Sequence, residues 1–364
     1  MGASRLLRAL PFAVAFVLGA LAYGPIRRDA SALGLLKRLS ADAPAQLPPP
    51  SFTLGEDRRA FRARLYVPDG NVEQCLVLGH GVHYKAIDDP RLIRFASELS
   101  RSGAAVLTPE LADLADYRIT RSGADVLGDA VRFLSEHCLT TGGKVGLIGF
   151  SFAGGLSLIA AQEPDVSSRL SFVTSVGGYH DLSRVLRFFL ANEVVAPGGI
   201  VPKRAHEYGL VVLLYGHLEA LVPEEDYFVA RDAVRAWLHE DRKLAWTLAS
   251  ERTTKEAESL FVRIAGGQAA FYRPVLEDIV SRSARDLAEL SPRGKLATLP
   301  IPVYLLHGTG DSVIPPEETL WAERELSGRP HRALITPLLE HVKLGSTDAL
   351  ADAAKLVDFM SLLL

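Results

Sequence analysis

The chain has 364 residues, of which 48% are apolar and 23% are charged. This length is enough to bury a large core, and the composition is that of a globular protein rather than a disordered one. The formal net charge is −3 and no basic run with interleaved aromatic residues occurs, which argues against nucleic acid as a partner.

Residues 1–30 differ from the rest of the chain. Arg5 and Arg8 precede an uncharged, mostly apolar stretch of 18 residues from Ala9 to Ile26. A basic start, an apolar middle and the small residues of Ala20–Ala22 are typical of a secretory signal, and the length is at the lower limit for a bilayer-spanning helix. We therefore expect a signal peptide or membrane anchor, in a protein that is exported or membrane-anchored (periplasmic or extracytoplasmic if bacterial). A buried N-terminal helix is the alternative.

Residues 31–50 are predicted to be a linker. Their second half, residues 41–50, is rich in proline, which favours a stiff and extended tether. The folded body is expected to begin near Ser51.

From Phe61 onward, short apolar runs alternate with amphipathic helical patterns. This alternation predicts a parallel sheet with helices on both faces. Strands are expected at residues 61–67, 75–78, 104–107, 145–148 and 171–176, and helices at 91–101, 124–137 and 153–161.

The pattern changes between residues 182 and 299, where the spacing of apolar residues is almost entirely helical. Strand patterns return at residues 302–306 and 332–335, and a final helix is expected at 347–362. The simplest interpretation is a lid inserted into an α/β domain.

The sequence therefore predicts a doubly wound, mostly parallel α/β sheet formed by residues 51–181 and 300–364. An all-helical lid, residues 182–299, is inserted between the strands that precede Asp181 and Asp311.

The only two cysteines are Cys75 and Cys138. Cys75 opens a predicted strand and Cys138 ends a predicted helix, so both are expected near the bottom edge of the sheet. A disulfide is one hypothesis, favoured by export, and two unrelated buried thiols are the other.

Ser151 lies in the sequence Gly-Phe-Ser-Phe-Ala-Gly between a predicted strand and a predicted helix. A serine exposed on such a turn is a nucleophile elbow, in which the residues two before and two after the serine must be small. These residues are Gly149 and Ala153, and alanine adds only a methyl group where G-x-S-x-G has glycine. A strand-to-helix turn with an incidental serine is the alternative.

The turn containing His80 and Gly81 follows an earlier buried strand. Turns of this kind expose backbone N–H groups to a substrate oxygen, and we assign the N–H groups of Val82 and Phe152 to an oxyanion hole. His80 is then expected to be structural and His83 to lie at the rim.

Asp311 follows a predicted strand in the glycine-containing loop His-Gly-Thr-Gly-Asp. Its place before a helix suits an acid that fixes the tautomer of a histidine, although turn aspartates are also common. Asp181 is the rival acid, and we prefer Asp311 because of its loop.

His341 stands between the last predicted strand and the last predicted helix. A single histidine in a loop is usually a surface residue. Its place after Ser151 and Asp311 in the chain makes it the leading candidate for a general base.

The order Ser151, Asp311, His341 resembles the α/β-hydrolase superfamily over about residues 61–181 and 302–364. The His80-Gly81 turn, among other features, looks like that of dienelactone-hydrolase-type and related bacterial esterases. Dienelactone hydrolases proper use a cysteine nucleophile and lack a lid of this size.

The resemblance implies hydrolysis of a small-molecule carboxylic ester through an acyl-enzyme. The apolar residues of the lid suggest that an apolar acyl or alcohol group binds under it. A peptidase, thioesterase or acyltransferase could use the same triad, and a non-catalytic binding protein or a membrane-tethered interaction protein could share the fold. No H-E-x-x-H, C-x-x-C or G-x-G-x-x-G motif occurs, so neither a metal nor a cofactor is expected.

Overall fold

A mostly parallel sheet of eight strands forms the centre of the molecule, in the order β1-β2-β4-β3-β5-β6-β9-β10. Only the pairs β1–β2 and β2–β4 are antiparallel. The strands are β1 (Phe52–Leu54), β2 (Phe61–Tyr66), β3 (Gln74–Gly79), β4 (Ala104–Pro109), β5 (Val145–Phe150), β6 (Leu170–Val176), β9 (Val303–Gly308) and β10 (His331–Thr336). The computed structural model describes residues 27–41, 47–56, 60–138, 140–250, 254–340, 343–344 and 350–364.

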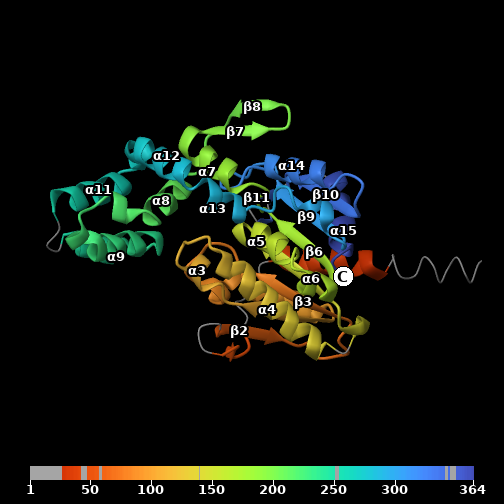
Figure 1. The fold of residues 1–364 in the computed structure, drawn as a ribbon. Coiled ribbons are helices and arrows are strands. Elements are labelled where there is room, and N and C mark those ends of the chain that lie inside the picture. The colour runs from red at the N-terminus through yellow and green to blue at the C-terminus, as the bar shows by residue number, and fades with distance from the viewer. Residues whose placement is uncertain are drawn as a thin grey trace, which may run out of the picture.

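Helices cover both faces of the sheet, as the sequence pattern predicted (Figure 1). On one face, α4 (Arg121–His137), α5 (Phe152–Ala160) and α14 (Glu317–Glu325) share a hydrophobic cluster with the strands. On the other, α2 (Pro90–Arg101) and α15 (Leu350–Ser361) form a second cluster with them. The central strands are therefore buried on both sides, which explains their continuous apolar sequences.

Two predicted boundaries are wrong, because residues 27–40 form a helix that takes in the end of the predicted signal or anchor segment (1–30) and the first half of the predicted linker (31–50). Ala32 and Leu35 are fully buried in the second cluster, where Leu36 and Leu39 also pack. These residues have the spacing i, i+3, i+4, i+7 of a helix face. The folded body thus begins well before Ser51.

The lid is mostly helical, but the prediction that it is all helical is wrong. A hairpin of β7 (Glu193–Ala196) and β8 (Gly199–Pro202) follows the first lid helix. Its β-branched residues flank the turn Pro197-Gly198-Gly199, which is a hairpin signal. The lid helices are α7 (Leu182–Ala191), α8 (Glu207–Tyr215), α9 (Tyr227–Leu238), α10 (Arg242–Ala249), α11 (Lys255–Ala265), α12 (Arg273–Arg282) and α13 (Ala284–Glu289).

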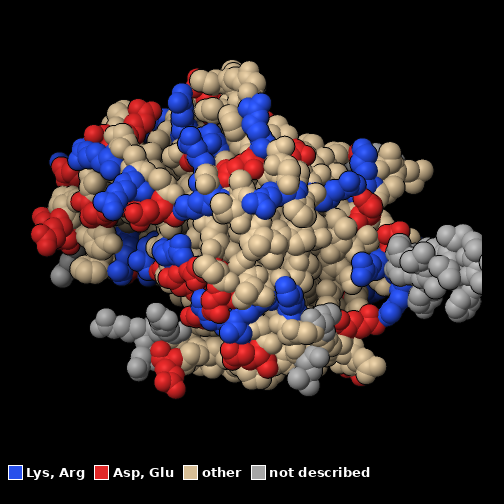
Figure 2. Space-filling view, turned by 45° about the vertical axis from the view of Figure 1, so that its right-hand side comes forward, with Lys and Arg blue, Asp and Glu red and all other residues tan. Residues whose placement is uncertain are grey.

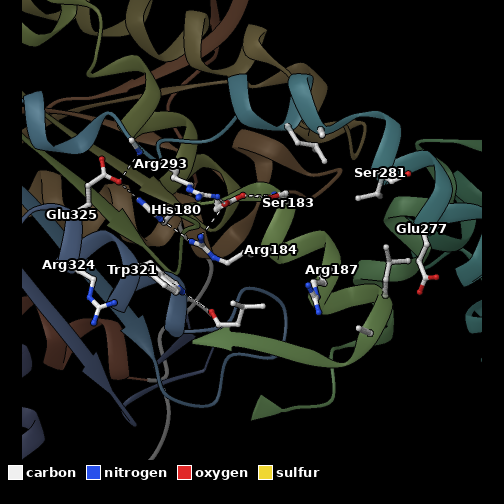
Figure 3. A pocket seen from close by; sticks show the side chains of 18 of the residues that line it. His180, Ser183, Arg184, Arg187, Glu277, Ser281, Arg293, Trp321, Arg324 and Glu325 are labelled. Carbon is white, nitrogen blue, oxygen red and sulfur yellow. Dashed lines mark hydrogen bonds and ion pairs between the residues drawn. The ribbon is translucent and has the colours of Figure 1, made fainter. Parts of the chain in front are cut away.

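Two glutamates of α14 hold both ends of the lid. Glu318 accepts hydrogen bonds from the backbone N–H groups of His180 (3.0 Å) and Asp181 (2.8 Å), where the lid begins. Glu325 accepts from His180 Nε2 (2.6 Å) and from the N–H groups of Gly294 (2.9 Å) and Leu296 (2.6 Å), where the lid ends (Figure 3). The lid is therefore attached to the core through a buried network of charged groups.

The surface carries charges of both signs. On the face shown in Figure 2, basic and acidic side chains are interspersed rather than gathered into one basic patch. Within the described part of the chain, none of the helices combines the length and apolar character needed to cross a bilayer. The apolar stretch Ala9–Ile26 lies outside the described residues.

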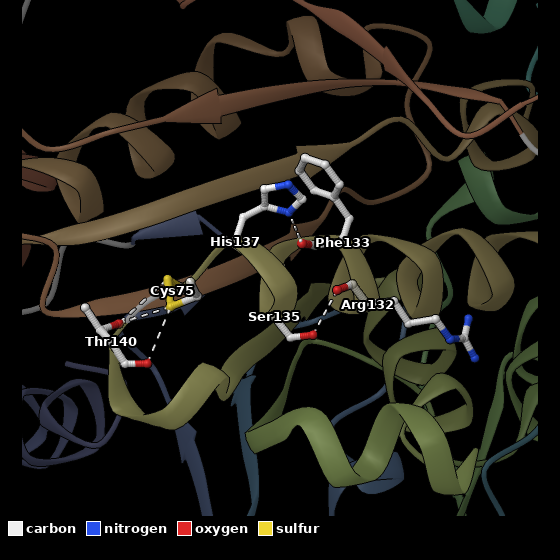
Figure 4. Close-up of a disulfide and its surroundings, with 7 residues drawn as sticks. Cys75, Arg132, Phe133, Ser135, His137 and Thr140 are labelled. Carbon is white, nitrogen blue, oxygen red and sulfur yellow. Dashed lines mark hydrogen bonds between the residues drawn. A yellow bond between two sulfur atoms is a disulfide. The ribbon is translucent and has the colours of Figure 1, made fainter.

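The structure confirms the disulfide hypothesis. Cys75, in β3, is bonded to Cys138, which directly follows α4 (Figure 4). Both residues are buried. The bridge joins the amino end of a central strand to the carboxyl end of its covering helix, so it lies at the edge of the sheet opposite Ser151.

Replacing both cysteines, as Cys75→Ala with Cys138→Ala, is expected to lower the free energy of unfolding by about 4 kcal/mol, because the bridge closes a long loop in the unfolded chain. The sequence separation is 63 residues. Denaturant titration of the variant and of the wild type, with and without reductant, measures this difference. An oxidised wild type with the same midpoint as the variant would contradict the prediction.

Candidate active site

Ser151 lies at the turn between β5 and α5. Its backbone has φ 54° and ψ −128°, and non-glycine residues rarely adopt a positive φ. The turn is held by a hydrogen bond from the Ser151 N–H to the Val176 carbonyl at 2.8 Å. Strain of this kind persists only where the surrounding structure enforces it, and it presents the serine side chain at the carboxyl edge of the sheet.

Close packing around this turn explains the small residues on either side of the serine. A Cβ atom added to Gly149 would lie 2.2 Å from the Ala153 carbonyl oxygen and 2.3 Å from Ser157 Oγ, so only glycine fits there. At the second position the methyl group of Ala153 faces Gly79, whose added Cβ would lie 3.2 Å away. Alanine is accommodated because its neighbour is a glycine.

The predicted oxyanion loop lies directly beside the serine. A Cβ atom added to Gly81 would lie 3.1 Å from Ser151 Cβ and 3.7 Å from its Oγ. Phe152 is the first residue of α5, so its N–H has no acceptor within that helix. Gly81 and the start of α5 therefore both lie next to Ser151. The assignment of the Val82 and Phe152 N–H groups to an oxyanion hole stays a prediction.

His80 orients the Gly81–Val82 peptide. Its Nε2 accepts a hydrogen bond from the Leu111 N–H at 2.9 Å, so the ring is neutral and Nδ1–H donates to the Gly81 carbonyl at 2.8 Å. The peptide is trans, so the Val82 N–H points away from the His80 ring. Both ring nitrogens of this buried residue are engaged, which agrees with the expectation that His80 is structural.

Burial lowers the pKa of His80, because a charged ring would lose its solvation in the core. An unfolded histidine has a pKa of about 6.5. The unfolded chain therefore binds the proton more readily, and the contribution of neutral His80 to stability is complete above that pH and is lost as the pH falls below it.

We expect acidification from pH 7.5 to pH 5 to reduce the free energy of unfolding of the wild type more than that of His80→Gln. The slope from this one group has a limit of about 1.4 kcal/mol per pH unit. Denaturant titrations at several pH values measure the two slopes. Parallel pH profiles for the two proteins would contradict the prediction.

Asp311 is held rigidly in the loop after β9. Its Oδ1 accepts hydrogen bonds from the N–H groups of Val313 (2.8 Å) and Ile314 (3.0 Å), and Oδ2 lies 3.4 Å from His307 Nε2. The Asp311 residue is only 1% exposed. His307 donates from Nε2 to the Ile314 carbonyl at 2.9 Å and so stabilises the loop. The Asp311 carboxylate is thereby fixed at the same edge of the sheet as Ser151.

Comparison with solved structures identifies this architecture. The rice cell wall degrading esterase LipA of Xanthomonas oryzae aligns over 84% of this chain and 85% of its own, with 16% identity and a TM-score of 0.52. The chain has the α/β-hydrolase fold. No protein-family model and no curated protein matches it.

Two other solved structures align less closely. Est1E of Butyrivibrio proteoclasticus covers 86% of this chain and 98% of its own, with 13% identity and a TM-score of 0.46. Acylaminoacyl peptidase of Pyrococcus horikoshii covers 79% of this chain, with 12% identity and a TM-score of 0.44. The chain spans only 36% of the length of that peptidase.

His341, the predicted general base, lies outside the described residues. The neighbouring residues show where the chain approaches it. Leu339 and Glu340 form β11, which pairs with β12 (Lys343–Leu344). A Cβ atom added to Gly308 would lie 2.2 Å from the Leu339 carbonyl oxygen, so the chain before His341 runs along the carboxyl end of β9, beside the Asp311 loop.

The rival acid Asp181 is engaged in contacts of its own. It caps α7 by accepting from the Ser183 N–H at 2.9 Å, and it pairs with Arg184 at 3.1 Å and Arg293 at 2.8 Å. The groove at the end of the lid (Figure 3) includes Asp181 but neither Ser151 nor Asp311. Asp181 therefore belongs to the lid attachment.

His83 lies at the rim, as expected, with 30% of its side chain exposed and Nδ1 3.6 Å from Asp89 Oδ2. Burial lowers its pKa. Among the described residues, no group of three or more His, Cys, Asp or Glu side chains is arranged to hold a metal ion.

The start of α8 contacts both the loop after β9 and the loop after β3, which the sequence did not reveal. The N–H of His206 donates to the carbonyl of Ser312, next to Asp311, at 2.8 Å. Two residues later, the hydroxyl of Tyr208 lies 3.3 Å from the carbonyl of Val82. The lid therefore connects the loop of Asp311 to the loop of Gly81 and Val82. The Ser151 residue is only 5% exposed.

Proposed function

We propose that this protein is a serine hydrolase that cleaves a carboxylic ester by way of an acyl-enzyme. The observation that carries the proposal is the backbone of Ser151, held at φ 54° between β5 and α5 with the Gly81 peptide against its side chain. A serine in this position is exposed to a carbonyl carbon while backbone N–H groups surround the carbonyl oxygen.

In the proposed mechanism, Ser151 Oγ attacks the ester carbonyl while His341 accepts its proton. The N–H groups of Val82 and Phe152 stabilise the developing oxyanion. His341 then gives the proton to the leaving alcohol and later activates the water that releases the acid. Asp311 orients His341 and stabilises its charged form.

We further propose that an apolar acyl or alcohol group binds under the lid. The support is α8, whose start contacts both loops of the site and whose residues Tyr208 and Val212 are only partly buried. Leu210, Leu213 and Leu214 are buried in the protein's own core, so the substrate would contact other residues of the lid. Peptides, thioesters and acyl transfer to an alcohol remain alternatives on the same residues.

The test is fluorophosphonate labelling of the protein, followed by mass spectrometry of the labelled peptide and a chain-length series of nitrophenyl esters. We expect one label on Ser151 and hydrolysis that depends on chain length. Labelling elsewhere, or a folded protein that is neither labelled nor active on any ester, would reject the hydrolase and favour a non-catalytic binding protein of the same fold.

We also propose that residues 1–26 direct export or anchor the protein in a membrane. Arg27 pairs with Glu73, just before β3, so the chain enters the folded body at the edge of the sheet opposite Ser151. An anchored protein would turn its active site away from the bilayer. Cell fractionation of the full chain and of a variant lacking residues 1–26 tests this, and an identical distribution of the two would reject it.

A further inference from the structure

The carbonyl groups on both sides of Val82 are held by hydrogen bonds. The Gly81 carbonyl accepts from His80 Nδ1 at 2.8 Å, and the Val82 carbonyl accepts from the hydroxyl of Tyr208 at 3.3 Å. His80 belongs to the core, whereas Tyr208 belongs to α8 of the lid. The two peptide planes that fix the backbone of Val82 are thus held from two different parts of the protein.

Tyr208 is well placed to keep this contact. Its ring packs edge-on against Tyr117 of the core, with 6.2 Å between the ring centroids. Burial raises the pKa of Tyr208, so its hydroxyl stays protonated and donates to the Val82 carbonyl. The N–H of His206 fixes the same end of α8 to the carbonyl of Ser312.

We propose that Tyr208 is a positioning residue for the oxyanion hole, which is completed only when the lid is closed. The inference rests on the proposed function, because it needs the Val82 N–H as an oxyanion donor. The hydroxyl of Tyr208 holds the second peptide of Val82, and this limits rotation about the Val82 backbone. Lid closure and assembly of the oxyanion hole are then one event.

Loss of the Tyr208 hydroxyl leaves the bond from His80 to the Gly81 carbonyl in place. The Val82 N–H is then misaligned for part of the time, but it is not removed. Complete loss of one oxyanion donor costs roughly a hundred- to a thousandfold in kcat. We therefore expect Tyr208→Phe to lower kcat about tenfold with little change in KM, since the donor acts mainly in the transition state.

Tyr215 provides a matched control on the same helix. Its hydroxyl also connects the lid to the core, at 2.8 Å from Asp116 Oδ1, but that bond does not involve the oxyanion loop. Both substitutions remove one hydroxyl and keep the ring. Tyr215→Phe should leave kcat within about twofold of the wild type if the role of Tyr208 is to position Val82 rather than merely to close the lid.

The experiment measures kcat, KM and the fluorophosphonate labelling rate for both variants, together with hydrogen exchange of the peptide that carries residues 79–86. Tyr208→Phe should exchange faster in that peptide and Tyr215→Phe should not. Unchanged exchange and kcat in Tyr208→Phe, or equal losses in both variants, would overturn the inference while leaving the hydrolase proposal intact. A wild-type protein with no label on Ser151 would reject the proposed function, and the inference with it.

Discussion

The Ser151→Ala variant is expected to hydrolyse esters roughly a millionfold more slowly than the wild type, with its fold unchanged. The three residues of a triad act as a unit, so removing the nucleophile alone loses nearly all of the rate enhancement that they provide together. The fold should persist because the Ser151 turn is held by backbone hydrogen bonds and alanine meets the same backbone strain as serine.

A second serine of α5 serves as the control. Ser157 is fully buried, and its hydroxyl has no hydrogen-bond partner among the described residues. Ser157→Ala should therefore keep full activity and equal or greater stability. Steady-state rates, fluorophosphonate labelling and denaturant titration compare the two variants. Residual hydrolysis by Ser151→Ala at more than a hundredth of the wild-type rate would show that another residue attacks the ester.

The sheet could be predicted because its central strands are short, apolar runs bounded by turn residues. Burial on both faces demands such sequences, and the intervening helices show regular amphipathic spacing. The elbow was predictable for a similar reason, since Gly149 has no room for a side chain and this restriction is visible in the sequence.

Other features depend on contacts between distant segments, and local patterns do not specify them. The bond between Tyr208 and the Val82 carbonyl joins residues 126 positions apart, and nothing near Tyr208 in the sequence indicates it. The role of His80 required knowledge that the Leu111 N–H faces its ring. By contrast, the helix over residues 27–40 and the β7–β8 hairpin carried local signals. The neighbouring proline-rich tether obscured the signal of the helix, and the helical pattern of the lid obscured that of the hairpin.

The surroundings of Asp311 and Asp181 show what the structure adds to the sequence pattern when the proposed acid is chosen. Both residues follow strands at the carboxyl edge of the sheet, so the topology allows either. Their surroundings differ, because Asp181 pairs with Arg184 and Arg293, whereas Asp311 accepts from two backbone N–H groups and lies 3.4 Å from the His307 ring. Backbone donors fix a carboxylate in place without providing a competing full charge.

Asp311→Asn is expected to lower kcat about ten thousandfold, because an amide N–H facing the histidine would stabilise the wrong tautomer of the base. The amide oxygen of the asparagine can still accept from Val313 and Ile314, so the loop should keep its shape. Asp181→Asn should instead weaken the pairs with Arg184 and Arg293, lowering stability while changing kcat less than tenfold.

Measuring kcat and the free energy of unfolding for both variants separates the two roles. The activity loss should belong to Asp311→Asn and the stability loss to Asp181→Asn. The reverse pattern would assign the catalytic acid to the residue after β6, and α7 would then have to be part of the active site rather than of the lid attachment. Equal activity losses with normal folding would mean that the site depends on the lid attachment as strongly as on the acid itself.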